Sequence, residues 1–107
     1  MKRIAPVFFF TLALPLPAPA QDTLNAQQLE GMRHFNQSCR VCHTKPQMTS
    51  PQYAPALSKA TLNGQQEALR VFIANGTPKM PGFKYHFKPR EIDAIAAYLA
   101  TVAPQPD

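Results

Sequence analysis

The sequence feature that most restricts the fold of this chain is the segment Cys39-Arg40-Val41-Cys42-His43. It contains the only two cysteines among 107 residues, and a histidine directly follows the second. Because just two residues separate the thiols, they cannot link distant parts of the chain, and a disulfide between them would stabilise the fold little. The spacing presents two thiols and an imidazole within about one helical turn, which suits the binding of another chemical group.

The N-terminus has the features of a secretory signal peptide. Lys2 and Arg3 give a positive start, a mostly apolar stretch follows, and Ala18-Pro19-Ala20 is a small-residue cleavage pattern. A retained membrane anchor would need about 20 unbroken apolar residues, whereas prolines interrupt this run. We therefore expect residues 1–20 to be a signal peptide that is cleaved after Ala20, with no stable membrane insertion afterwards.

The remaining residues, 21–107, form one domain of a size that buries only a thin core. Small domains of this kind often depend on a disulfide, a metal or a cofactor. Without Lys2 and Arg3 the charge of the chain falls from +5 to near +3. The basic residues form no long run and have no interleaved aromatic residues, so nucleic-acid binding is not expected.

Apolar periodicity predicts three helices, at residues 24–38, at residues 64–75, and from Pro89 until Pro104 ends the third. No stretch alternates with period two, so the predicted class is all-α. The loops at residues 44–60 and 77–88 carry apolar side chains without a regular element of their own. Loops of this length need something apolar to pack against, which three short helices cannot fully provide.

The C-x-x-C-H spacing is typical of a c-type haem attachment site, in which the thiols of Cys39 and Cys42 bond to the porphyrin and His43 ligates the iron. Three other uses of these residues are less well supported. A thioredoxin-like pair needs a βαβ context, a structural zinc site needs about four ligands, and a short-range disulfide contributes little. Haem c, one per chain, is the expected cofactor.

A haem held by one histidine has a second axial position, and the segment at residues 76–83, G-T-P-K-M-P-G-F, offers Met80 for it. Methionines also fill gaps in ordinary cores. With the haem motif present, we expect His43 and Met80 to be the two metal ligands. His34 and His86 lie among polar or basic neighbours and are expected to be non-ligands.

With these motifs, the chain resembles the class I c-type cytochromes, and in particular the small mono-haem cytochromes of the bacterial periplasm. The resemblance covers residues 25–104. It rests on the haem motif, on the M-P-x-F element, and on further residues of the helices and the intervening loop: Gly31, Phe35, Ala54, Pro55, Ala56, Leu57, Ile95, Tyr98 and Leu99. It implies three to four helices and long loops around one covalent haem, in a domain spanning residues 21–107.

The family likeness also implies roles for individual residues. Pro55 would turn its carbonyl towards the ring N–H of His43, and Phe35 and Tyr98 would pack where the first and last helices cross beside Gly31. The implied pocket wall consists of Leu57, Phe72, Ile73, Phe83, Ile95 and Leu99. The chain has no tryptophan, so contacts to the haem propionates stay open among Tyr53, Lys59, Arg70 and Tyr85.

The expected function is that of a diffusible periplasmic one-electron carrier, a monomer and not an enzyme. Its partners would be redox proteins. Two interpretations stay open for the basic residues expected around the haem edge: an ordinary solvated face, or a surface that attracts partners with an acidic docking face. These residues are Arg40, Lys45, Lys79, Lys84 and Lys88. A periplasmic quinoprotein dehydrogenase is one candidate donor. The alternative is a haem enzyme or gas sensor in which Met80 is readily displaced.

Overall fold

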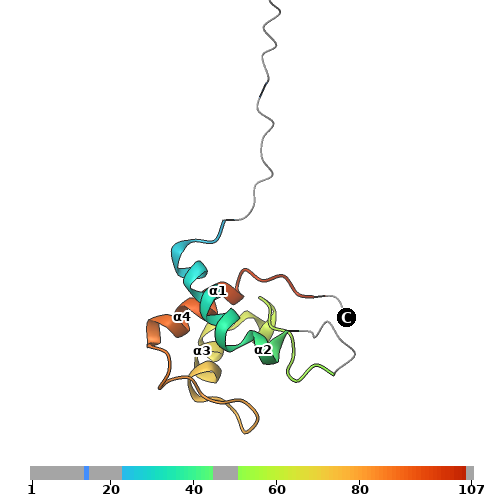
Figure 1. Ribbon diagram of the computed structural model, residues 1–107, viewed down its shortest axis with the longest axis vertical. Coiled ribbons are helices and arrows are strands. Elements are labelled where there is room, and N and C mark those ends of the chain that lie inside the picture. Colours follow the sequence, from blue (N-terminus) through green and yellow to red (C-terminus); the bar gives the residue numbers. More distant parts are fainter. Residues whose placement is uncertain (1–13, 15–22, 45–50, 106–107) are drawn as a thin grey trace, which may run out of the picture.

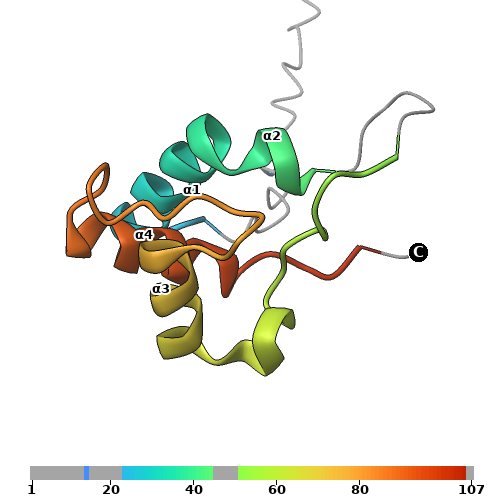
Figure 2. The same cartoon turned by 90° about the horizontal axis from the view of Figure 1, so that it is seen from below.

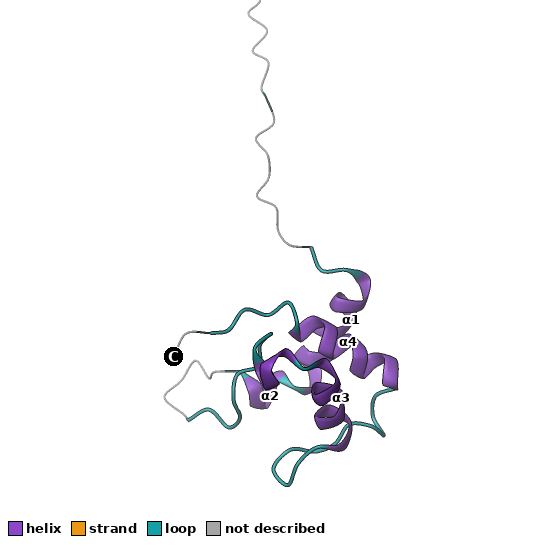
Figure 3. Cartoon of the chain, turned by 180° about the vertical axis from the view of Figure 1, so that it is seen from behind, coloured by secondary structure: helices purple, strands orange, loops and turns teal. Residues whose placement is uncertain are grey.

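The structure, a computed structural model, describes residue 14, residues 23–44 and residues 51–105 (Figure 1). The predicted signal peptide, apart from Leu14, therefore lies outside the described residues. Within the described ranges the chain forms helices and loops without a strand (Figure 3), which confirms the all-α class. The elements are α1 (Ala26–Ser38), α2 (Arg40–His43), the 3-10 helix η1 (Thr61–Gly64), α3 (Gln66–Asn75) and α4 (Pro89–Leu99). None of these helices has the length and apolar character needed to cross a bilayer.

Helix α1 begins two residues later than its periodicity predicts, because Asn25 caps it. The Asn25 side chain accepts a hydrogen bond from the Gln28 N–H at 2.8 Å, and the Gln28 side chain accepts one from the Asn25 N–H at 3.0 Å. This reciprocal pair satisfies two backbone donors that would otherwise lack partners. The spacing N-x-x-Q carried this signal in the sequence.

Helices α1 and α4 pack directly against each other at Gly31 (Figure 1). A Cβ atom added at Gly31 would overlap the carbonyl of Ala94, so only glycine permits this approach of the two backbones. Next to it the rings of Phe35 and Tyr98 lie 5.6 Å apart between centroids, at 52°. Both contacts agree with the packing that the family likeness implies.

The core lies between α1, α3 and α4. Its most deeply buried large side chains are Ile95 and Leu99 of α4, each 1% exposed. Around them lie further buried side chains from three helices and one loop: Phe35, Cys39, Leu69, Ile73, Phe87, Ile92 and Ala96. Helix α4 ends at Leu99, earlier than predicted, although Val102 beyond it still packs on the core.

Two loops extend from this core on the side of α2 (Figure 2). The segment after α2 is held by hydrogen bonds from Ala54 N–H to the Cys42 carbonyl at 3.1 Å and from Lys59 N–H to the Val102 carbonyl at 2.8 Å. It ends in η1, where Leu62 and Asn63 adopt positive φ angles of 53° and 55°. The other loop connects α3 to α4 and carries Met80.

Candidate functional site

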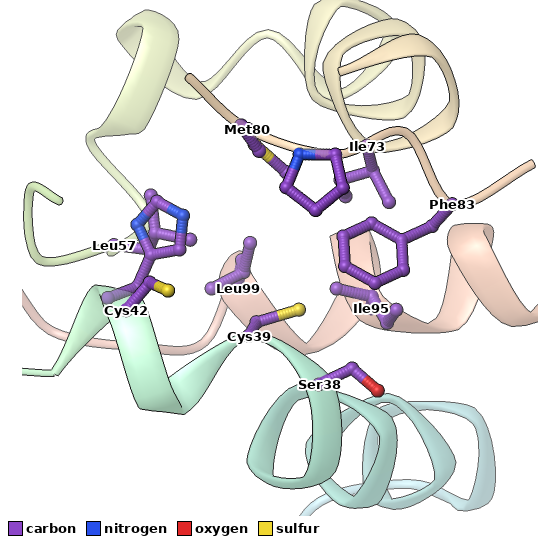
Figure 4. Close-up of a pocket in the computed structure, with 11 residues that line it drawn as sticks. Ser38, Cys39, Cys42, Leu57, Ile73, Met80, Phe83, Ile95 and Leu99 are labelled. Atoms are coloured by element: carbon purple, nitrogen blue, oxygen red, sulfur yellow. The ribbon is translucent and has the colours of Figure 1, made fainter. Parts of the chain in front are cut away.

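The junction of α1 and α2 presents both cysteines to one cavity (Figure 4). Neither cysteine takes part in a disulfide, and Cys39 is buried while Cys42 is half-buried. Burial, and secondarily the neighbouring charge of Cys42, raise the pKa of the Cys39 thiol to about 11. The unmodified thiol is therefore protonated at neutral pH and is a weak nucleophile on its own.

His43 is oriented by the loop that follows it. Its Nδ1 lies 2.8 Å from the carbonyl oxygen of Pro55. A carbonyl can only accept a hydrogen bond, so Nδ1 carries the proton and Nε2 keeps a free lone pair. The hydrogen bond from Ala54 to Cys42 holds this segment beside α2. The imidazole is thus fixed in the tautomer that can ligate a metal through Nε2.

Met80 lies on the wall opposite the two cysteines, at the tip of the loop after α3 (Figure 4). Thr77 and Met80 close this tip with two backbone hydrogen bonds, at 2.9 Å and 3.1 Å. Gly76 begins the turn with a φ of 71°, which glycine adopts without strain. The tip is tied back to α3 through a hydrogen bond from the Phe83 N–H to the Ile73 carbonyl at 2.9 Å.

The cavity between these walls has an inner part of about 60 Å³. It opens to an outer groove of about 740 Å³ that shares Cys42, His43, Met80 and Pro81 with it. Almost all of the inner lining is apolar: Ser38, Cys39, Cys42, His43, Leu57, Ile73, Met80, Pro81, Phe83, Ile95 and Leu99. Two thiols on one wall, an imidazole with a free nitrogen, a thioether opposite and an apolar lining fit the requirements of a covalently attached haem.

One expected wall residue lies elsewhere. The Phe72 side chain is 44% exposed and does not line the cavity. Helix α3 turns Leu69 and Ile73 inward, and Phe72, three residues after Leu69, falls outside that narrow face. Phe87, in the loop at residues 77–88, is buried in the core, which agrees with the expectation that apolar residues of this loop need an apolar partner. Its position in an irregular loop gave no periodic signal.

The four candidates for the propionate contacts differ in whether they line the cavity or the outer groove. Tyr53 lines the outer groove together with Lys79. Arg70 is engaged elsewhere, in an ion pair with Asp93 at 2.6 Å. Tyr85 is 94% exposed, and neither it nor Lys59 lines the cavity or the groove. Of the other residues that the sequence singled out, His34 and His86 are absent from the cavity lining, and Lys45 lies outside the described residues.

Comparisons with known proteins agree with this geometry. Residues 26–99 match the family described as cytochrome c oxidase, cbb3-type, subunit III. Cytochrome c6 of Nostoc sp. strain PCC 7120 is 33% identical over 87% of this chain and 82% of its own length. A cytochrome c6-like protein of the same strain is 28% identical over 92% and 88%.

Among solved structures, a mutant form of Kustc0563 superimposes with a TM-score of 0.50 and 26% identity, covering 66% of this chain and 95% of that one. The match to the family spans more than half of the chain and includes both cysteines and Met80. The chain therefore belongs to the class I c-type cytochromes, which carry covalently bound haem c and transfer electrons to and from partner proteins rather than catalyse reactions.

Proposed function

We propose that this cytochrome is a periplasmic one-electron carrier, with its haem attached through Cys39 and Cys42 and ligated by His43 and Met80. The observation that supports this best is the shared cavity, which is lined by both thiols and the His43 imidazole, with the Met80 thioether on the wall opposite the cysteines. Bound haem supplies an iron that alternates between the Fe(III) and Fe(II) states. The side chains around it determine which ligands reach the metal and how easily an electron enters.

Two groups set the properties of the metal site. The Pro55 carbonyl holds the His43 ring through Nδ1 and makes Nε2 a more basic ligand. The Met80 thioether would favour the reduced state and would fill the position that an outside ligand needs. The apolar lining keeps water from the site, which also favours the less charged, reduced form. These features suit a carrier that exchanges electrons without binding a substrate at the metal.

The ligation can be tested with carbon monoxide on the haem-loaded protein. The reduced protein is expected not to bind carbon monoxide at neutral pH, because Met80 would fill the remaining ligand position of the iron. The substitution Met80→Ala should open that position and give rapid binding, seen as a change in the visible absorption spectrum. Met32→Leu is the matched control, since Met32 lies on α1 and does not line the cavity. Rapid binding by the unmodified protein would instead support a haem enzyme or gas sensor.

Exposed basic residues close in sequence to the haem motif and to Met80 support docking to acidic partners. Arg40 follows Cys39 directly, Lys79 lines the outer groove, and Lys84 lies on the same loop as Met80. Long-range attraction of this kind is screened within about 10 Å at 0.1 M salt. The rate of electron transfer from a periplasmic donor, with a quinoprotein dehydrogenase as the first candidate, should therefore fall as salt rises. A rate independent of ionic strength would contradict electrostatic steering.

The proposal includes export of the protein to the periplasm and cleavage of its signal peptide. The N-terminal pattern that ends at Ala20 supports cleavage during secretion. Sequencing the N-terminus of the protein from a periplasmic extract should give Gln21 as the first residue. Recovery of the uncleaved chain in the membrane fraction would argue for a retained anchor.

A further inference from the structure

A second group of potential metal ligands lies where α1 meets α4, among residues that do not line the haem cavity. Glu30 and His34 lie one turn apart on α1, and Glu91 lies in the first turn of α4. One ligand atom from each of these three side chains lies within 4.8 Å of the others. We propose that Glu30, His34 and Glu91 bind a divalent transition-metal ion of the Zn²⁺ type, linking the first and last helices.

The distances are close to those of a bound metal. Ligand atoms that each lie about 2.1 Å from a tetrahedral ion are roughly 3.4 Å from one another. His34 Nε2 lies 3.7 Å from the nearer oxygen of Glu30 and 3.9 Å from that of Glu91. These two distances exceed the ligand spacing by less than about 0.6 Å, and the oxygens of Glu30 and Glu91 lie within 4.8 Å of each other.

The surroundings already orient two of the three ligands. The Lys88 N–H donates to Glu91 Oε2 at 2.7 Å, whereas the other oxygen, Oε1, faces His34. The His34 ring packs edge-on against Phe87, with centroids 4.9 Å apart at 61°. The contact of Gly31 with Ala94 fixes the spacing of the two helices. A metal at this position would find a partly ordered site on rigid elements, which lowers the cost of binding.

The three side chains are between 19% and 31% exposed, so an ion could enter from solvent. They line an open groove together with Ala26, Arg33 and Gln37. One imidazole and two carboxylates suit Zn²⁺ and its neighbours in the transition series better than Ca²⁺ or Mg²⁺, which prefer oxygen ligands alone. Water from the groove would complete the coordination.

A positive charge competes with the metal at this site. The guanidinium of Arg90 lies 3.3 Å from Glu30 Oε1, the same oxygen that is closest to His34. The Arg90 side chain is 67% exposed, so the ion pair is held loosely and can be exchanged. Replacing Arg90 should therefore strengthen metal binding. If Glu30, His34 and Glu91 only stabilised the packing of the two helices, replacing Arg90 would not strengthen metal binding.

Isothermal titration of the haem-loaded protein with Zn²⁺ tests the proposal, in a buffer that does not bind the metal. We expect one Zn²⁺ per chain. His34→Gln and Glu30→Gln should each weaken binding at least about tenfold, while Arg90→Gln should tighten it severalfold. His86→Gln is the matched control, because His86 packs on the same Phe87 ring but has no carboxylate partners among the described residues. Its affinity should equal that of the unmodified protein.

A second measurement guards against variants that are merely unstable. The haem absorption and the far-ultraviolet circular dichroism of each variant should match the unmodified protein before the titration. Zn²⁺ should raise the thermal midpoint of the unmodified protein by more than that of His34→Gln at the same concentration, since only the folded site binds. Equal Zn²⁺ affinity in the unmodified protein and His34→Gln would overturn the proposal. So would a dissociation constant above about 1 mM in the unmodified protein.

Discussion

At Gly31 the missing side chain lets the α1 backbone lie against the carbonyl of Ala94 in α4. This contact joins the two ends of the domain, and it places the junction of α1 and α2 over the buried side of α4. Cys39 follows Phe35 by one turn, so the first thiol reaches the cavity because the helix that carries it is fixed here. A single residue without a Cβ atom therefore positions the first attachment point.

The substitution Gly31→Ala should destabilise the protein by about 1–3 kcal/mol, because an added methyl group forces two packed backbones apart. Denaturant unfolding of the haem-loaded protein measures this change. Gln27→Ala, at an exposed position of the same helix, should change the free energy of unfolding by less than about 0.5 kcal/mol. Equal stability of Gly31→Ala and the unmodified protein would mean that the helices are not in the contact described.

At the scale of the elements, α4 depends on its first turn. Pro89 is the first helical residue, and Glu91 accepts a hydrogen bond from the Lys88 N–H at 2.7 Å. That backbone donor, followed by the nearby basic side chains of His34, Arg90 and Lys88, lowers the pKa of the Glu91 carboxyl. Capping and charge together stabilise the start of the helix that contributes half of the buried hydrophobic residues among those described.

The lowered pKa of Glu91 makes its contribution dependent on pH. A carboxyl whose pKa is lower in the folded state than in the unfolded state stabilises the fold at pH values above its pKa in the unfolded chain, which is about 4.3 for a glutamate. This contribution is lost as the pH falls through the pKa that the carboxyl has in the folded protein. Glu91→Gln should therefore be less stable than the unmodified protein at pH 7, and the difference should shrink on acidification towards pH 3. Urea unfolding across this range would show a constant difference if the cap did not involve the charged form.

Helix positions were largely predictable from the sequence, because the apolar spacing in each segment matches the face that the fold buries. Pro89 marks the start of α4, and Asn75 with Gly76 marks the end of α3, as expected. The predicted start at Gly64 was too early, since Gly64 closes η1 with a φ of 73°. Leu62 and Asn63 have left-handed backbones there, and local sequence favours such conformations only weakly.

The candidate site was predictable for a different reason. Cys39, Cys42 and His43 are adjacent in sequence, so their chemistry is visible without a fold. The cavity lining is assembled from four helices and two loops. Only tertiary packing determines that Phe87 is buried and Phe72 exposed. The group formed by Glu30, His34 and Glu91 was not predicted, because 57 residues or more separate Glu91 from the other two.

At the scale of the whole molecule, the haem of this family completes the interior. Leu57, Ile73 and Leu99 face the cavity that holds the two thiols, and the long loops around it have little regular structure of their own. Without an apolar group between these walls, their side chains would contact water or collapse on one another. The stability of the domain should therefore depend on its cofactor.

A double substitution, Cys39→Ser with Cys42→Ser, should prevent haem attachment and abolish cooperative unfolding. Thermal melts followed by far-ultraviolet circular dichroism would show a broad, shallow transition in place of a sharp one. The control is Arg40→Ala with Val41→Ala, which keeps both thiols and His43 and should retain the sharp transition. A haem-free variant that unfolded as cooperatively as the unmodified protein would show that the polypeptide builds its core alone.

The most direct test of the account is the intact mass of the denatured protein, purified from cells able to attach haem, after treatment with a thiol-alkylating reagent. Covalent attachment through Cys39 and Cys42 predicts the polypeptide mass plus one haem, with no alkyl group added. A mass that shows two alkylated thiols and no haem would contradict the central claim.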